Sequence, residues 1–243
     1  MNLEELQSRC YTPYSNSPDA VIVQSESGKF FPGIRIENIS FPLSITALQC
    51  GMVICLSEGE EPKKLFLPEG YESTEKHLDY WTNEFSLEFV ENGQIDGEAS
   101  EILKTSDSIN SSLQRLLDRS LTPYSQFPVS ALLVTSNGFV TGVNIEFSAW
   151  DLGLCAERVA LAKALAYGID TAEINALHLH SRHGDFSSPC GACRQVIVEH
   201  LPRIPVCIHH PDGTLSRHFS SDLLPYSFKS DFLKKNNRQD TSE

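Results

Sequence analysis

Three cysteines and one glutamate have the types and spacing that metal-assisted chemistry requires. Cys155 and Glu157 stand in the segment C-A-E-R, and Cys190 and Cys193 stand in the segment P-C-G-A-C-R-Q. Three thiolates can hold one tetrahedral Zn²⁺ and leave a fourth position open for water, which a catalytic zinc site needs and a structural site does not. Glu157 would then lie close to the metal without binding it, where a carboxylate can move protons.

The cysteines should be positioned by two helix N-termini. Residues 156–167 are rich in Ala and Leu and are followed by Gly168, which predicts a buried helix with a glycine stop. Ser188 and Pro189 predict the start of a second helix, with Ser as N-cap and Pro at the first helical position. The helix dipole and the unpaired N–H groups at such termini favour thiolate over thiol.

The surrounding sequence alternates between helical and strand patterns. Apolar residues at Ile109, Leu113, Leu116 and Leu117 share one face of a helix. Strands are expected at 131–134 and 139–145, joined by a Ser-Asn-Gly turn, and again at 177–180 and 206–209. This alternation predicts a three-layer α/β domain.

The chain contains the same pattern twice. T-P-Y-S occurs at 12–15 and 122–125, and G-I-R-I-E-N-I-S-F-P-L at 33–43 parallels G-V-N-I-E-F-S-A-W-D-L at 142–152. Two collinear matches with one residue of length difference predict two similar domains. A cluster of Thr, Ser and Asp residues near 106–108 places their boundary, so that the domains are residues 1–106 and 107–243.

Composition excludes several classes of partner. The 243 residues carry a net charge of −13, and residues 1–110 account for −12 of it, with 19 acidic and 7 basic side chains. This charge disfavours DNA, RNA and anionic membranes. The N-terminal ten residues have no apolar signal region, and the apolar runs are too short to span a bilayer. We therefore expect a cytoplasmic protein whose clustered cysteines serve metal binding or catalysis and not disulfides.

The C-A-E and P-C-x-x-C segments closely resemble the zinc signature of the cytidine deaminase family in its three-cysteine form, and the likeness extends over 113–233. The resemblance implies a three-layer α-β-α fold with a mixed sheet, present here as two tandem copies. It also implies Zn²⁺ on Cys155, Cys190 and Cys193, with a zinc-activated hydroxide attacking C4 of the pyrimidine and Glu157 moving the protons. Arg158 matches the arginine that offsets the charge of the thiolates.

The resemblance also implies the substrate contacts. Asn144 and Glu146 match a pair that binds the ribose hydroxyls, and residues at i and i+2 of a strand share one face. Phe127 matches an aromatic residue that packs on the base, although plain core packing is its alternative. Ala156 belongs to the same set, and so does Phe228, in a segment L-L-P-Y-S-F that reaches a neighbouring active site.

The implied function is hydrolytic deamination of cytidine, 2′-deoxycytidine or both, in pyrimidine salvage. Phe147 and Trp150 replace an asparagine and a tyrosine of the family, which leaves the nucleoside open. The alternatives are a deaminase of another cytosine nucleoside of the blasticidin kind and a nucleoside-binding pseudoenzyme. An RNA or DNA editor is disfavoured by Cys155, because the nucleic-acid enzymes mostly carry His there.

The first copy lacks the site. Aligned with the second copy, it has Thr46 for the first cysteine, Leu48 for the glutamate and Gln49 for the arginine, while Glu37 is kept as a structural acid. We expect a catalytically dead domain that serves as a scaffold. Since single-domain members of the family are tetramers, two of these chains are expected to form a homodimer that is a pseudo-tetramer.

The other candidate ligands are expected to be structural. Cys10, Cys50, Cys55 and Cys207 lie in apolar or unpatterned surroundings and should be small buried hydrophobic residues. The acidic stretch 58–101 should be a solvated face. Hydrogen-bonded or surface positions are expected, with further metal ligation as the alternative, for five histidines: His178, His180, His183, His209 and His210.

Overall fold

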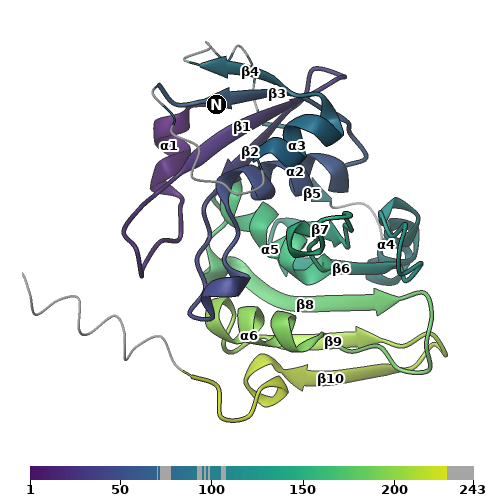
Figure 1. Ribbon diagram of the computed structural model, residues 1–243. Helices are drawn as coiled ribbons and strands as arrows, with labels where there is room; N and C mark the ends of the chain where they lie inside the picture. The colour runs from purple at the N-terminus through teal and green to yellow at the C-terminus, as the bar shows by residue number, and fades with distance from the viewer. Residues whose placement is uncertain are drawn as a thin grey trace, which may run out of the picture.

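The computed structural model describes residues 1–69, 71, 78–91, 95, 97, 99–104 and 108–228 (Figure 1). The expected boundary between residues 106 and 107 lies outside these residues. The N-terminal half contains α1 (Leu3–Ser8), β1 (Ala20–Ser25), β2 (Phe30–Ile34), α2 (Ala47–Ser57), β3 (Pro62–Leu67), α3 (Leu78–Phe85) and β4 (Glu88–Glu91). The C-terminal half contains β5 (Leu103–Lys104), α4 (Ile109–Leu116), β6 (Val129–Thr135), β7 (Gly138–Val143), α5 (Ala156–Ala166), β8 (Ile174–Ser181), α6 (Gly191–His200), β9 (Pro205–His209) and β10 (Leu215–Phe219).

Each half is built on a mixed sheet, and the two sheets repeat one topology. The first has the strand order β2-β1-β3-β4, and the second has β10-β9-β8-β6-β7-β5. In the first sheet β1 is antiparallel to β2 and β3, while β3 and β4 are parallel. The strands β6, β7, β8 and β9 repeat this arrangement, and β5 and β10 extend the second sheet at its two edges. The predicted repeat and the mixed sheet are therefore confirmed.

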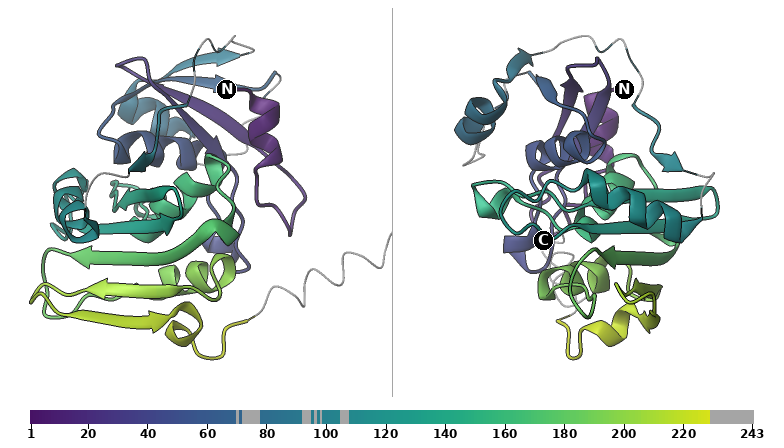
Figure 2. Two further views of the ribbon diagram at one scale, coloured as in Figure 1. Left: turned by 180° about the vertical axis from the view of Figure 1, so that it is seen from behind. Right: turned by 90° about the vertical axis from the view of Figure 1, so that its right-hand side faces the viewer.

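The C-terminal half has the predicted three layers. On one face of its sheet, Leu133 and Leu177 share a core cluster with residues of α5 and α6. On the other face, Ser130 donates a 2.8 Å hydrogen bond to the carbonyl of Leu113 on α4. Neighbouring residues of a strand point to opposite faces, so β6 separates the two helical layers. Figure 2 shows the second sheet with helices on both sides.

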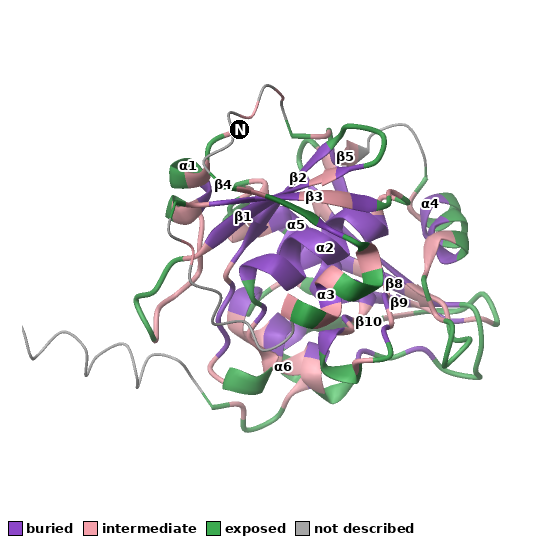
Figure 3. Cartoon of the chain, turned by 45° about the horizontal axis from the view of Figure 1, so that its top comes forward, coloured by how far each residue is buried: buried purple, intermediate pink, exposed green. Residues whose placement is uncertain are grey.

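The two halves are joined through a buried helix pair. The helices α2 and α5 lie between the two sheets and pack on one another (Figures 1 and 2). All of α2 is buried, and so is α5 apart from Leu165, as the purple centre of Figure 3 shows. Helices that are buried on every side lie inside a core and not at a surface. One hydrophobic cluster accordingly runs through both halves.

Two equivalent glycines let these helices approach the sheets. A Cβ at Gly33 would lie 2.2 Å from the carbonyl oxygen of Ala47, at the start of α2. A Cβ at Gly142 would lie 2.2 Å from the carbonyl oxygen of Ala156, at the start of α5. Such distances are far inside van der Waals contact, so both positions must be glycine for the helix to begin where it does.

Most predicted elements of the second half are confirmed. The helix α5 ends at Ala166, and Gly168 takes a φ of +78° after it. The hairpin of β6 and β7 turns at the predicted Ser-Asn-Gly segment. Of the cysteines outside the motif, Cys50, Cys55 and Cys207 are buried as expected. None of the helices in the described part of the chain is long and apolar enough to cross a membrane.

Two predictions were wrong in detail. The helix α6 has Cys190 and not Ser188 as its N-cap, because the Cys190 sulfur accepts the N–H of Cys193 at 3.4 Å. Ser188 instead accepts a 2.7 Å hydrogen bond from Arg194. The acidic stretch 58–101 is not wholly solvated either, since the Glu58 side chain is 13 % exposed and pairs with a buried lysine of the other half.

Candidate active site

The three motif cysteines converge on one point. Cys155 is the N-cap of α5, Cys190 is the N-cap of α6, and Cys193 lies in the first turn of α6. Their three sulfur atoms lie within 4.8 Å of one another, and those of Cys155 and Cys190 are 3.7 Å apart. Tetrahedral zinc with Zn–S bonds of about 2.3 Å separates its sulfur ligands by about 3.8 Å. The donor set and its spacing therefore fit zinc.

Helix termini and sulfur contacts set the charge of the cluster. Hydrogen bonding from the neighbouring thiols lowers the pKa of Cys190, and the same contacts contribute to raising the pKa of Cys155 and of Cys193. The cluster thus favours a thiolate at the exposed end of α6, where the helix dipole also favours negative charge. A divalent cation is what would allow all three sulfurs to be thiolates together.

Glu157 is buried beside the sulfur cluster. Its side chain lies in the first turn of α5, and the residue is 6 % exposed. Burial raises the pKa of this carboxyl to about 7, with a further contribution from the charge of Cys190. A carboxyl that titrates near neutrality can accept a proton and return it within one turnover.

Arg158 connects the cluster to the N-terminal half. Its Nη2 donates a 2.8 Å hydrogen bond to the carbonyl oxygen of Leu43. Its Nε is buried and has no hydrogen-bond partner among the described residues. Burial lowers the pKa of the guanidinium, and the nearby thiol groups oppose that change. Arg158 is therefore anchored through its Nη2, and its Nε–H is free to donate to a thiolate.

Glu146 is engaged by the turn that precedes β6. Its Oε2 accepts the N–H groups of Tyr124 at 3.2 Å and Ser125 at 3.0 Å, and its Oε1 accepts the Ser125 hydroxyl. Glu37 accepts the equivalent donors in the first copy, from Tyr14 at 3.0 Å and from the backbone and side chain of Ser15. The structural role expected for Glu37 is confirmed, and Glu146 shares it.

Asn144 directly follows β7 and lies two residues before Glu146. Its Oδ1 accepts the N–H of Val129 at 2.8 Å, and its Nδ2 donates to the carbonyl of Phe127 at 2.9 Å. The amide thus ties the end of β7 to the strand beside it. One N–H of the amide remains for a further acceptor.

A pocket of about 150 Å³ brings part of the predicted site together. It is lined by Asn144, Ile145, Glu146, Phe147, Trp150, Gly153, Leu154 and Cys155. The other predicted substrate residues are not among its lining: Phe127 is 38 % exposed, Ala156 is buried and Phe228 is 58 % exposed. The pocket joins the proposed sugar contacts to one metal ligand.

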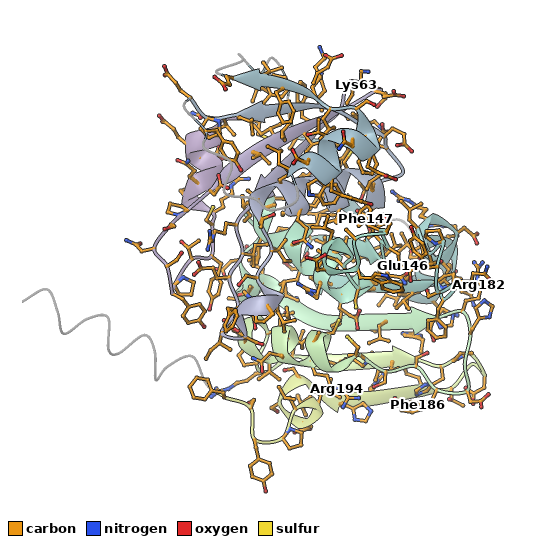
Figure 4. The ribbon with its side chains drawn as sticks, viewed as in Figure 1. Lys63, Glu146, Phe147, Arg182, Phe186 and Arg194 are labelled. Carbon is orange, nitrogen blue, oxygen red and sulfur yellow. The ribbon has the colours of Figure 1, made fainter. Side chains whose placement is uncertain are left out.

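The two residues that depart from the family pattern have different surroundings. Trp150 is 73 % exposed at the start of the short helix η3 (Trp150–Leu152), with its ring 5.8 Å from that of Tyr124. Phe147 is 6 % exposed and packs on Trp81 of α3, as well as lining the pocket. Figure 4 labels Phe147 near the junction of the two halves and Glu146 among the elements of the C-terminal half. The sequence patterns gave no sign of Trp81.

The histidines are held by hydrogen bonds. Ring nitrogens of His178 and His209 lie 3.0 Å apart, and His180 lies 2.9 Å from the carbonyl of His209. Buried His210 accepts the N–H of Ser187 at 3.2 Å. Within the described residues, the three cysteines form the only group of three or more potential metal ligands. The hydrogen-bonded interpretation is confirmed for these four histidines.

The position equivalent to the metal site in the first copy has different chemistry. Thr46 caps α2 by accepting the N–H of Gln49 at 3.1 Å, and Leu48 is buried where the second copy has its glutamate. Gln49 donates a 2.9 Å hydrogen bond to the carbonyl of Leu152 in the other half. This contact mirrors the one between Arg158 and Leu43, which are the equivalent residues of the two copies.

Comparison with known proteins decides the family. Family models described as the cytidine and deoxycytidylate deaminase zinc-binding region match residues 105–208 and residues 5–66. A probable cytidine deaminase of Dictyostelium discoideum is 40 % identical over 124 residues, which are 50 % of this chain and 82 % of that protein. The chain belongs to the cytidine deaminase family. It is a two-domain member of this family of zinc-dependent enzymes.

Further relatives match about half of this deaminase. The cytidine deaminase of Sporosarcina psychrophila is 37 % identical over 48 % of this chain and 85 % of its own length. The crystal structure of cytidine deaminase from Burkholderia pseudomallei is 35 % identical, covers 51 % of this chain and 100 % of its own, and has a TM-score of 0.48.

Glu199 makes a further contact between the two halves that the sequence patterns did not indicate. Glu199 of α6 accepts hydrogen bonds from the hydroxyl of Tyr14 at 2.7 Å and from the N–H of Ile39 at 2.9 Å. The helix that carries two of the cysteines is thus held at its other end by the N-terminal half. No local pattern marks Glu199, because its partners belong to the other copy.

Proposed function

We propose that this chain catalyses the hydrolytic deamination of cytidine, 2′-deoxycytidine or both, giving the uridine nucleoside and ammonia. The observation that carries the proposal is the buried Glu157 beside three convergent sulfur atoms. Zinc bound by Cys155, Cys190 and Cys193 would supply a Lewis acid that makes a water molecule nucleophilic near neutral pH.

Glu157 is the proposed catalytic residue. Attack of water on C4 of the cytosine ring forms a C–O bond and releases one proton, which N3 of the ring accepts. The hydroxyl now on C4 then gives its proton to the amine as the C4–N bond breaks and the carbonyl of the uridine forms. A carboxyl whose pKa is about 7 can take the proton from water, pass it to N3 and then assist the loss of ammonia. Arg158 would donate its free Nε to a thiolate and so offset negative charge at the centre.

The pocket would hold the sugar beside the metal centre. Asn144 retains one amide N–H, and the Oε1 of Glu146 accepts one hydrogen bond and can accept another, so both side chains can reach a ribose hydroxyl. Phe127 and Ala156 are proposed to contact the base. Phe228 is exposed and is proposed to reach the active site of a neighbouring copy.

The N-terminal domain is proposed to be catalytically inactive. We place it at residues 1–106 and the catalytic domain at residues 107–243. Thr46 is a poor zinc ligand and Leu48 cannot move a proton, which supports this assignment. Its hydrogen bonds, which join Leu43 to Arg158 and join Tyr14 and Ile39 to Glu199, support a scaffold role.

A homodimer with the arrangement of a tetramer is proposed as the assembly. Phe41 and Trp150 occupy equivalent positions of the two copies, and they are 82 % and 73 % exposed. Large exposed aromatic side chains of this kind mark interaction surfaces. Light scattering should give twice the chain mass of 27.1 kDa. A stable, fully active monomer would contradict the assembly.

Pyrimidine salvage and a cytoplasmic location are the proposed cellular setting. Both rest on the implied nucleoside substrate and on the sequence, and the partner is a small molecule, with neither nucleic acid nor membrane involved. Cell fractionation with an antibody to the chain tests the location.

A substrate panel tests the function. The zinc content of the purified chain is measured, and the loss of ultraviolet absorbance is followed with cytidine, 2′-deoxycytidine and a blasticidin-type nucleoside. Turnover of the first two supports the proposal, and turnover of the third alone would favour the antibiotic deaminase. Zinc-loaded protein without activity on any of them would indicate the pseudoenzyme.

A further inference from the structure

One wall of the pocket is supported by the N-terminal half of the chain. Phe147 lines the pocket and packs edge to face on Trp81, with ring centroids 4.9 Å apart and planes at 82°. Tyr80 and Phe85, from the same helix, pack on Phe147 at near right angles with centroids 6.4 Å away. Edge-to-face contacts have a preferred geometry, so three rings of α3 hold Phe147 in one orientation.

Trp81 is the anchor of this arrangement. It is the buried residue of α3 and is 0 % exposed, whereas Tyr80 and Phe85 are half-buried. Ser148, the next residue of this loop, also donates a 3.3 Å hydrogen bond to the Tyr80 hydroxyl. The buried side chain of α3 is therefore in direct contact with a residue that lines the pocket.

The chemistry of the wall differs from that of its neighbours. Asn144 and Glu146 can form hydrogen bonds with a bound molecule, whereas the Phe147 ring can interact with it only through van der Waals contact. A ring held from behind by packed aromatic side chains cannot retreat without opening a void. The position of Phe147 should therefore limit the size of the sugar substituents that the pocket can accept.

We propose that Trp81 is a positioning residue for the nucleoside pocket, acting through Phe147. By this contact the N-terminal domain, which lacks metal ligands of its own, sets the shape of the pocket beside Asn144 and Glu146 and hence which nucleoside sugars enter. The inference rests on the proposed function, because it assumes that the pocket receives the sugar of a cytosine nucleoside.

The test compares two nucleosides that differ in sugar size, cytidine and 2′-O-methylcytidine, in the full-length chain. In W81L the KM for cytidine should rise about tenfold and kcat should stay within about twofold, since the metal centre is untouched. The kcat/KM for 2′-O-methylcytidine relative to cytidine should increase. F147L should give the same pattern, and W81L/F147L should add little to either single substitution.

Matched variants separate positioning from folding. W81F keeps a ring in the core and should change the KM and the selectivity in the same direction by a smaller amount. It replaces W81L in the test if W81L does not fold. D79N changes an exposed side chain of the same helix and should leave the kinetics of both nucleosides unaffected. Zinc per chain should be unchanged throughout, and uridine binding measured by calorimetry should weaken in parallel with the rise in KM.

Two results would overturn the inference. One is a selectivity between the two nucleosides that stays at its original value in both Trp81 variants. The other is full multiplication of the effects of W81L and F147L, which would mean that the two side chains act independently. Absence of turnover of every cytosine nucleoside by the unaltered chain would instead refute the proposed function, and this inference with it.

Discussion

The Nζ of Lys163 lies 2.5 Å from a carboxylate oxygen of Glu58, and this ion pair crosses the seam between the two copies. The lysine side chain is 0 % exposed, and it has Thr141 as a further neighbour at 3.4 Å. Arg119 donates to the second oxygen of Glu58 at 3.2 Å. The N-terminal half thus supplies the counter-charge for a lysine buried in α5, the helix that Cys155 caps.

Removing this counter-charge should destabilise the chain in a pH-dependent way. Burial alone would raise the pKa of Glu58, but Lys163 and Arg119 outweigh it and lower the pKa below the ordinary 4.5. The pair therefore stabilises the fold above pH 4.5, and this contribution is lost as the pH falls through the lowered pKa. E58Q should lose about 3 kcal/mol at pH 7, because it leaves a buried charge unpaired.

Urea unfolding at pH 7 and at pH values below 4 measures this effect, and the gap between E58Q and the unaltered chain should shrink at the lower values. E5Q is the matched control, because Glu5 and Arg9 form an equally short pair at the surface. That control should lose at most about 0.5 kcal/mol. A gap that is the same at every pH would contradict the role of the Glu58 charge.

Glu157→Gln should separate metal binding from proton transfer. The glutamine has the same shape but cannot move a proton, so turnover of cytidine should fall by about 10³-fold or more. The three sulfur ligands are untouched, and zinc per chain, measured by atomic absorption, should equal that of the unaltered chain. If the variant lost its metal, Glu157 would have a structural role instead.

Gly142→Ala should disturb the metal site through the backbone. The new Cβ would lie 2.2 Å from the carbonyl oxygen of Ala156 and 2.6 Å from the N of Ala160, so the start of α5 would have to move. We expect a loss of about 2–3 kcal/mol in stability, together with less zinc per chain. The measurements are the thermal midpoint and the zinc content.

Gly191→Ala is the control for that prediction, because a Cβ there meets nothing within 4 Å. It should keep the thermal midpoint of the unaltered chain. A Gly142→Ala protein with normal stability and normal zinc would show that α5 can shift without cost.

The two equivalent glutamates should share one effect and differ in another. Glu37 and Glu146 each accept three hydrogen bonds from the turn before the first strand of their copy, so E37A and E146A should each cost about 1–3 kcal/mol. Only E146A should also raise the KM for cytidine, because only Glu146 lines the pocket. An equal rise in KM for E37A would indicate that the effect comes from the fold alone.

The sequence predicted the features that depend on neighbouring residues. The Cys-x-x-Cys spacing, the helix that ends before Gly168 and the hairpin turn are each determined by local hydrogen bonding and by the φ values that individual residues allow. The repeat also predicted two domains of similar fold, since similar segments have the same local preferences, and the two sheets do share a strand order. Even the error at Ser188 was local, a choice between two capping side chains two residues apart.

The tertiary structure decided how the two copies contact one another. The partner of Lys163, the rings behind Phe147 and the carbonyl bonded to Arg158 all belong to the other half of the chain. Periodicity and spacing report on a segment and its own neighbours, whereas these contacts depend on the angle and distance at which two folded halves pack. The chemistry of the metal ligands could therefore be inferred from the sequence alone, while the surroundings that orient them required the packed structure.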